Sequence, residues 1–214
     1  MACAALMYAL RGRPGARHGA ALTPWPLRYW KPVQTGIEQD DDTQVVRTLG
    51  ACTDEEVLDV GVRLARPLSP HLSAQLAGTT LSIDRIVTPL VGDVDTSCWI
   101  VEGAGGVLVP LNDSEFMIDL MVRLAMPVLV VARSGLGTIN HTLLTLEALQ
   151  ARRLTVAGVL MIGEPNEHNR AAIESRGRVA VIGQLPRVDP LTPDRLREAA
   201  AEHIDPLPLR ARLS

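Results

Sequence analysis

Lys31 is the only lysine in the chain, and since Lys and Arg together number 21, the remaining 20 basic residues are arginines. It lies in the segment Trp30-Lys31-Pro32-Val33-Gln34-Thr35-Gly36. A lysine ammonium is a compact charge with three rotatable donors, and the planar guanidinium of arginine does not replace it where one small oxyanion must be bound. A single lysine in an arginine-rich chain therefore indicates an oxyanion site, although composition alone also allows chance.

Carboxylates and glycines elsewhere in the sequence extend this chemistry. Asp42 ends an Asp-Asp-Asp run, and Glu102 is followed by Gly103-Ala104-Gly105-Gly106. Mg²⁺ beside a nucleotide prefers one or two carboxylates together with waters, and glycine loops allow backbone N–H groups to approach phosphate oxygens. A lysine among them would neutralise a transferring phosphoryl group. Each signal is weak alone, because acidic runs are typical of solvated surfaces and Gly-rich segments of tight turns.

Short apolar segments alternate with helical stretches and predict the elements that position these residues. We expect strands over residues 27–33, 98–102, 127–132, 154–162 and 178–182, helices over 1–10, 71–78, 114–125, 139–151 and 192–202, a helix beginning near Asp42, and a loop over 11–26. This alternation is typical of an α/β fold with a parallel sheet covered by helices on both faces. Ligands bind at the carboxyl ends of such strands, where Lys31, Glu102, residues 134–138 and Gly163 are expected.

Composition excludes several classes of function. The 214 residues fit one domain, and a net charge of −3 with 3% aromatic residues argues against nucleic-acid binding. No apolar run reaches the roughly 18 residues that span a bilayer, so no membrane association is expected. The three cysteines are widely spaced and fit neither a disulfide framework nor a zinc site, which predicts a cytoplasmic protein.

Together these segments resemble the dethiobiotin synthetase family, the ATP-dependent ligases (cyclo-ligases) of biotin biosynthesis. The similarity is carried by Lys31-Pro-Val-Gln-Thr-Gly36, Ser69-Pro-His71, Val101-Glu-Gly-Ala-Gly-Gly-Val-Leu-Val-Pro110, Ala132-Arg-Ser-Gly-Leu-Gly-Thr-Ile-Asn-His141, Gly163-Glu-Pro and Gly183-Gln-Leu-Pro186. The resemblance runs through nearly the whole chain in order and implies a P-loop NTPase-like fold.

The resemblance implies an enzyme that forms a cyclic urea from 7,8-diaminopelargonate and CO₂ with Mg-ATP. It implies that Lys31 is catalytic, that Thr35 contacts the substrate, and that Asp42 and Glu102 bind Mg²⁺ and ATP. Further nucleotide-binding residues that it implies are Gly103, Ala104, Gly105, Ile162, Gly163, Pro186, Arg187 and Val188. It also implies a homodimer, with the helix N-terminus at 135–141 near the interface and suited to the substrate carboxylate.

The sequence departs from the family at its start. The family begins with a strand and a phosphate loop, Gly-x-x-x-x-Gly-Lys-Thr, whereas residues 2–11 here match the helix that follows that loop. We therefore expect a single dethiobiotin synthetase-like domain over 1–214, N-terminally truncated, whose first strand and phosphate loop are missing. A segment rich in Pro and Arg over 12–26, and Ile162-Gly163 in place of a polar pair, are further departures. Two alternatives stay open: a remnant or binding module without ATPase activity, and a related amide ligase for cobyrinate-type substrates.

Overall fold

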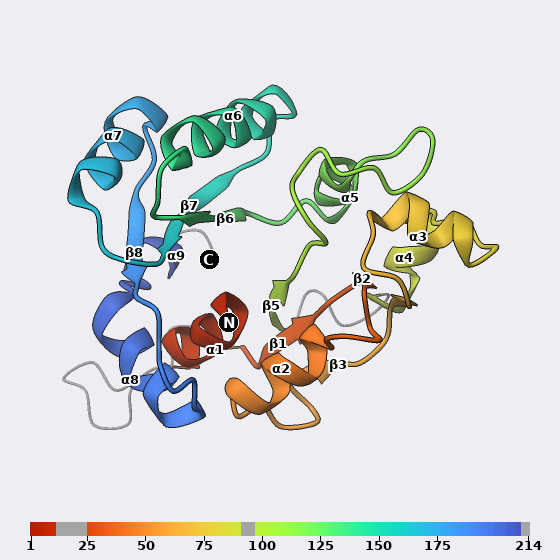
Figure 1. The fold of residues 1–214 in the computed structure, drawn as a ribbon, viewed down its shortest axis with the longest axis horizontal. Coiled ribbons are helices and arrows are strands. Elements are labelled where there is room, and N and C mark those ends of the chain that lie inside the picture. Colours follow the sequence, from red (N-terminus) through yellow and green to blue (C-terminus); the bar gives the residue numbers. More distant parts are fainter. Residues whose placement is uncertain (12–24, 91–96, 211–214) are drawn as a thin grey trace. The chain divides into compact units, whose positions relative to one another are not determined.

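The computed structural model describes residues 1–11, 25–90 and 97–210 (Figure 1). The chain divides into two compact units. The central unit comprises Trp25–Thr48 and Cys52–Ala125, and the terminal unit comprises Met1–Pro24, Leu49–Ala51 and Met126–Ser214. Each unit is described by itself.

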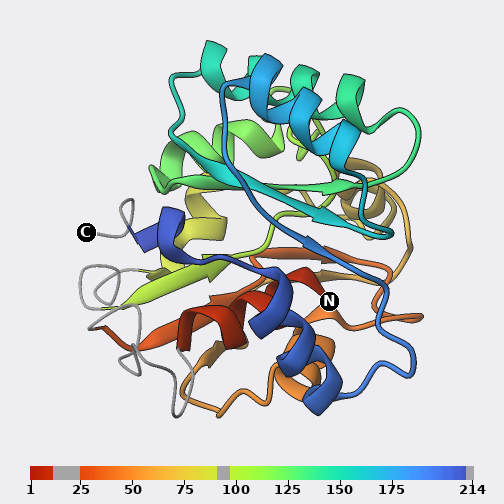
Figure 2. The same cartoon turned by 90° about the vertical axis from the view of Figure 1, so that its left-hand side faces the viewer.

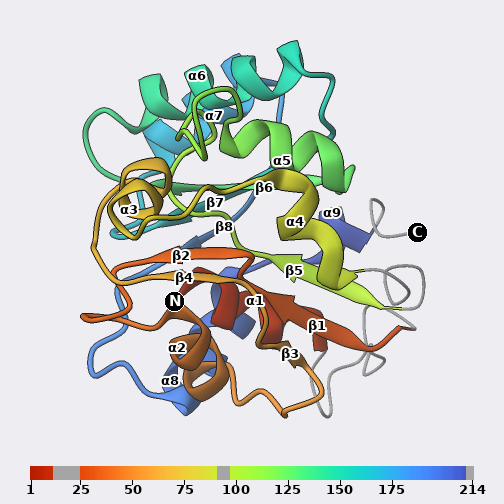
Figure 3. The same ribbon diagram turned by 90° about the vertical axis from the view of Figure 1, so that its right-hand side faces the viewer.

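The central unit is built on two small parallel sheets (Figure 3). The first has the order β3-β1-β5, and the second pairs β2 with β4. The strands are β1 Leu27–Trp30, β2 Val33–Thr35, β3 Val57–Leu58, β4 Val62–Leu64 and β5 Cys98–Val101, and the helices are α2 Asp42–Leu49, α3 Pro70–Leu76, α4 Ile83–Val87 and α5 Met117–Leu124, with a 3-10 turn η1 at Thr88–Leu90.

The register of β1 on β5 decides where their following residues lie. Trp30, the last residue of β1, pairs with Val101, the last residue of β5. The N–H of Glu102 then donates to the Trp30 carbonyl over 2.9 Å. Because parallel strands end at the same edge, Lys31 and Glu102 leave the sheet side by side.

An apolar core holds the central unit together. Trp30, Val33, Leu111 and Met117 are among its fully or almost fully buried members. The indole N–H of Trp30 donates to the carbonyl of Val60, so its one polar atom is satisfied. The core packs around the apolar part of Trp30 and the Val60 carbonyl holds its indole N–H, so the residue next to Lys31 is fixed on both sides.

The terminal unit contains a third parallel sheet, in the order β6-β7-β8. Its strands are β6 Val128–Arg133, β7 Val156–Ile162 and β8 Val181–Leu185, and its helices are α1 Ala2–Arg11, α6 Thr138–Ala151, α7 Glu167–Gly177, α8 Pro193–His203 and α9 Leu207–Arg210. Helices α6 and α7 lie side by side over the strands (Figure 2). All five residues of β8 are buried, as expected for a strand covered on both faces.

The expected α/β class with parallel strands and helices is confirmed. In the part of the chain that the structure describes, the strands form three sheets, a division that the apolar pattern did not predict. The last strand begins at Val181, not at 178, because Arg178 adopts a left-handed conformation (φ 50°) at the end of α7. The predicted loop at 11–26 lies mostly outside the described residues. In the ranges 1–11, 25–90 and 97–210, no helix is long and apolar enough to cross a membrane.

Thr192 supplies a test of the helix assignment at the end of the chain. Its side-chain oxygen accepts a hydrogen bond from the N–H of Arg195 and caps α8. Thr192→Ala removes this bond and is expected to lower the free energy of unfolding by about 1 kcal/mol. Urea denaturation measures the change, and Thr192→Ser, which keeps the hydroxyl, is the matched control. Equal losses in both variants would contradict the capping role.

Candidate active site

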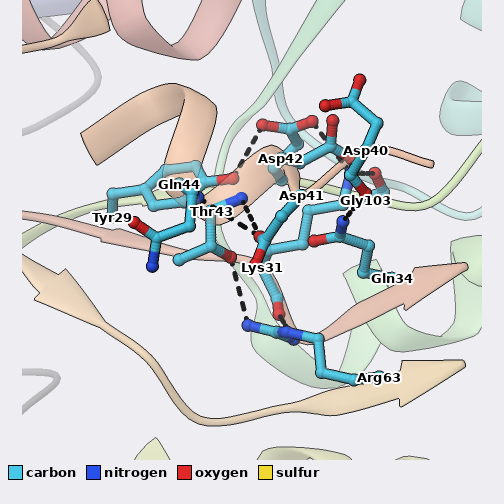
Figure 4. A network of polar contacts seen from close by, with 11 residues as sticks. Tyr29, Lys31, Gln34, Asp40, Asp41, Asp42, Thr43, Gln44, Arg63 and Gly103 are labelled. Atoms are coloured by element: carbon cyan, nitrogen blue, oxygen red, sulfur yellow. Dashed lines mark hydrogen bonds and ion pairs between the residues drawn. The ribbon is translucent and has the colours of Figure 1, made fainter. Parts of the chain in front are cut away.

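Lys31 is a buried ammonium surrounded by oxygen atoms (Figure 4). It is 5% exposed. Its Nζ lies 2.6 Å from Asp42 Oδ2 and 2.9 Å from Glu102 Oε1, and it donates to the Gly103 carbonyl over 3.3 Å. Three acceptors match the three N–H bonds of the ammonium, so burial leaves no donor unsatisfied.

The charge of this lysine is secured by its partners. Burial lowers the pKa of Lys31, but the carboxylates of Glu102 and Asp42 outweigh burial and hold the pKa above its ordinary value of 10.5. The stabilisation from this raised pKa is therefore fully present at neutral pH and is lost only as the pH rises through the raised value. Lys31 is a permanent cation in the neutral range, not a base.

Asp42 is positioned by the start of helix α2. Asp41 Oδ1 accepts hydrogen bonds from the N–H groups of Thr43 (3.0 Å) and Gln44 (3.2 Å), which is an N-cap. Asp42 is the first helical residue, and its side chain is 40% exposed. Its carboxylate therefore contacts the buried ammonium and also faces solvent.

Glu102 is positioned by the sheet and by a buried tyrosine. It follows β5 directly, and Tyr29, fully buried in β1, donates its hydroxyl to Glu102 Oε2 over 3.0 Å. The two oxygens of Glu102 thus have different partners, Tyr29 and Lys31. Because Glu102 and Asp42 share one ammonium, the site holds two carboxylates close together.

This pair of carboxylates fits a magnesium ion better than a metal that needs a complete protein cage. Among the residues described, no group of three or more His, Cys, Asp or Glu side chains could hold a metal ion. Mg²⁺ keeps several waters and takes one or two carboxylates plus substrate phosphates. Asp42 and Glu102 supply that donor set.

A cavity of about 220 Å³ opens beside Lys31 within the central unit. It is lined by Lys31, Thr35, Asp42, Leu68, Ser69, Pro70, Ala104, Gly105 and Val109. Five of the predicted site residues thus share one cavity. Ser69 and Pro70 belong to a motif that carries the resemblance, but the sequence does not indicate that they line the cavity. Leu68 and Val109 also line it and are not among the predicted site residues.

Five further predicted nucleotide-binding residues belong to the terminal unit. Ile162 ends β7, Gly163 follows it, and Pro186, Arg187 and Val188 follow β8. The N–H of Gly163 donates to the Leu185 carbonyl over 2.9 Å, so these two strand ends are neighbours. The terminal unit also has a cavity of about 640 Å³, lined by Leu136, Gly137, Ile139, Asn140, Leu143, Asn166 and Asn169. It includes part of the predicted 135–141 segment but none of the predicted nucleotide-binding residues.

Comparison with known proteins decides the family. A family model described as an AAA domain matches residues 2–195. ATP-dependent dethiobiotin synthetase BioD of Nitrobacter hamburgensis is 45% identical over 174 residues, which are 81% of this chain and 80% of that protein. The enzymes of the same name from Brucella ovis and Agrobacterium fabrum are 42% and 41% identical, covering 83% and 87% of this chain and 82% and 86% of theirs. The chain belongs to the dethiobiotin synthetase family.

The family assignment confirms the resemblance that the motifs indicated. A ParA family ATPase from Chlorobium tepidum matches structurally with a TM-score of 0.47 and 9% identity, over 99% of this chain and 90% of that chain. A likeness at that level adds nothing on function. The motif Lys31-Pro-Val-Gln-Thr-Gly36 of this dethiobiotin synthetase family member provides two of the residues that line the central cavity, Lys31 and Thr35.

Gly105 is a position where the cavity wall needs glycine. Its φ is +77°, and an added Cβ would lie 2.9 Å from Val109 Cγ2. Gly105→Ala is expected to lower the free energy of unfolding by about 1–2 kcal/mol, because an L side chain is disfavoured in the left-handed region. Gly106→Ala is the control, since an added Cβ at Gly106 meets nothing within 4 Å. Thermal or urea unfolding of both variants checks this, and equal stabilities would contradict it.

Proposed function

We propose that this chain is an ATP-dependent dethiobiotin synthetase that forms the cyclic urea of dethiobiotin from 7,8-diaminopelargonate, CO₂ and ATP. The observation that carries the proposal is the buried Lys31 ammonium, which lines a cavity together with Asp42 and lies beside Glu102. The names of the relatives, at 41–45% identity, support this activity. They favour neither a non-catalytic binding module nor a ligase for cobyrinate-type substrates.

The reaction has three steps with defined charges. One amine of the substrate attacks CO₂ and loses a proton, which gives an anionic carbamate. A carbamate oxygen takes the γ-phosphoryl group of ATP and releases ADP. The second amine then attacks the carbonyl carbon of this mixed anhydride, loses a proton and expels phosphate, which closes the ring.

Lys31 acts on the negative charge in these steps. A carbamate and a transferring phosphoryl group both carry charge on oxygen, and a preorganised cation in a site shielded from water stabilises it strongly. Lys31 is already charged and held by Asp42 and Glu102, so its ammonium needs little reorientation when the substrate binds. Thr35, in the same wall, is proposed to contact the diamine.

Asp42 and Glu102 are proposed to hold Mg²⁺, which supplies positive charge that neutralises the phosphate oxygens when bound. The donor set of two carboxylates supports this assignment. Gly103, Ala104 and Gly105 are proposed to line the nucleotide with backbone groups. The residues proposed to contact the nucleotide from the terminal unit are Ile162, Gly163, Pro186, Arg187 and Val188.

The remaining features are proposed from the family resemblance. We propose that the protein is a cytoplasmic homodimer, in which the helix N-terminus at 135–141 receives the substrate carboxylate, and that residues 1–214 form one domain. Neither nucleic acid nor a membrane is proposed as a partner. Sedimentation of the protein at micromolar concentration tests the dimer.

The activity is tested by ADP release. The protein, mixed with Mg-ATP, should release ADP only when both the diamine and bicarbonate are present. Omission of either should lower the rate to the background of ATP alone. ADP release that ignores the diamine, or no release in the complete mixture, would contradict the proposed function.

A further inference from the structure

Arg63 contacts the backbone of Lys31 from outside the cavity wall. It is the middle residue of β4, and its guanidinium makes two well-formed hydrogen bonds toward the site (Figure 4). Nη1 donates to the Lys31 carbonyl over 3.0 Å, and Nη2 donates to Thr43 Oγ1 over 3.1 Å. Thr43 is fully buried, so its hydroxyl has little access to water as an alternative donor.

These two acceptors belong to different elements that must meet. Lys31 follows β1, whereas Thr43 is the neighbour of Asp42 in the first turn of α2. The Lys31–Asp42 ion pair therefore depends on the position of a helix start relative to a strand end. A guanidinium presents its N–H donors in a fixed planar fork, so one Arg63 side chain bonded to both elements sets the separation between them.

Gly61 supplies independent support for this arrangement. A Cβ at Gly61 would lie 2.7 Å from Arg63 Nη1, 2.7 Å from the Lys31 carbonyl oxygen and 2.8 Å from the Pro32 carbonyl oxygen. A side chain at this position would occupy the space in which the guanidinium meets the Lys31 carbonyl. The absence of a side chain at Gly61 thus leaves room for this bond.

We propose that Arg63 is a positioning residue that holds Lys31 and Asp42 in catalytic register through the Lys31 carbonyl and the Thr43 hydroxyl. The importance of this placement for catalysis rests on the proposed function, but the placement of Lys31 and Asp42 by Arg63 does not. Arg63 does not line the cavity that holds Lys31 and Asp42, so it acts through these residues and not on the substrate.

Arg47 provides a matched control. Its side chain is 23% exposed against 22% for Arg63, and both arginines pair with Asp59 at 3.4 Å. Arg47 also pairs with Asp54, a surface residue. Arg47→Gln and Arg63→Gln therefore remove the same charge from the same Asp59 network, but only the second removes the bonds to Lys31 and Thr43.

The first readout is the chemical reactivity of Lys31, which needs no substrate. Because Lys31 is the only lysine, an acetylating reagent modifies one side-chain amine, and peptide mass spectrometry separates it from the N-terminus. At one fixed pH, Arg63→Gln is expected to raise the Lys31 labelling rate at least about fivefold, because the ion pair with Asp42 loosens, while Arg47→Gln stays within twofold. The thiol of buried Cys98 in β5 reports global loosening, and its labelling rate should not change.

The second readout is the division of the kinetic effect. Displacement of a charged group by about 1 Å can cost roughly 10²-fold in rate, so Arg63→Gln is expected to lower kcat about 10- to 100-fold with KM for the diamine within threefold. Arg47→Gln should leave both constants within twofold. If the unaltered protein forms no ADP, the proposed function fails, but the labelling experiment still decides the positioning role.

Thr43 offers a second pair of variants that keeps the proposal testable if Arg63→Gln does not fold. Thr43→Ser retains the hydroxyl acceptor, and Thr43→Val removes it at similar volume. Faster Lys31 labelling in Thr43→Val than in Thr43→Ser would support the proposal. Lys31 labelling as slow as in the unaltered protein for both Arg63→Gln and Thr43→Val would overturn it.

Discussion

Replacing Lys31 with methionine is expected to lower kcat by about 10³-fold, since loss of one group that stabilises a developing oxyanion costs roughly 10²–10³ in rate. Methionine keeps most of the apolar stem and removes the ammonium, with its charge and its three N–H donors. Steady-state ADP release with saturating diamine, bicarbonate and Mg-ATP measures the change. The loss should appear in kcat more than in KM, because the charge that Lys31 stabilises grows as phosphate is transferred.

Lys31→Arg separates the charge of the residue from its shape. It restores a cation but places a planar fork where Asp42, Glu102 and the Gly103 carbonyl surround a single Nζ. We expect it to recover less than about a tenth of the activity, because the fork and the point charge present donors differently. Full activity in Lys31→Arg, or normal turnover in Lys31→Met, would remove Lys31 from the catalytic machinery.

The second large effect is expected at the carboxylates. Asp42→Asn and Glu102→Gln keep the size of each side chain but remove its charge. Each substitution should lower kcat/KM by about 10²-fold or more, because loss of a group that orients a bound metal or substrate has effects in this range. The Mg²⁺ concentration for half-maximal activity should rise in both. Titration of activity with Mg²⁺ at fixed ATP measures this shift.

Asp54→Asn is the control for these carboxylate variants. Its side chain is 97% exposed and pairs with Arg47, away from the cavity. Loss of such an exposed pair is expected to cost well under about 1 kcal/mol of stability, and the Mg²⁺ dependence should not change. An unchanged Mg²⁺ requirement in Asp42→Asn and Glu102→Gln would exclude these residues as metal ligands.

The centre of this site could be predicted from the sequence for a physical reason. Lys31 and Glu102 each follow a short apolar segment, and parallel strands end at one edge of a sheet. The acidic run ending at Asp42 precedes a periodic stretch, which is typical of a helix start. The structure brings the carboxylates of Asp42 and Glu102 onto the ammonium of Lys31.

The supporting residues could not be predicted in the same way. Arg63 lies in a strand of three residues, Val62–Leu64, which is too short to show alternation. Tyr29 lies in the strand expected over residues 27–33, and only the fold brings its hydroxyl to Glu102. Helix α7 was also missed, because only Ile173 and Gly177 are buried in its 11 residues and no apolar stripe marks it.

The measurement that tests the central claim most directly is the fate of isotopically labelled bicarbonate. The protein should convert ¹³C-bicarbonate, 7,8-diaminopelargonate and Mg-ATP into dethiobiotin that carries the ¹³C atom in its ureido carbonyl, with one ADP released per molecule of product. Mass spectrometry of the product, with ADP quantified in parallel, gives both values. ADP release without labelled dethiobiotin, or unlabelled product, would contradict the claim that this site closes the cyclic urea.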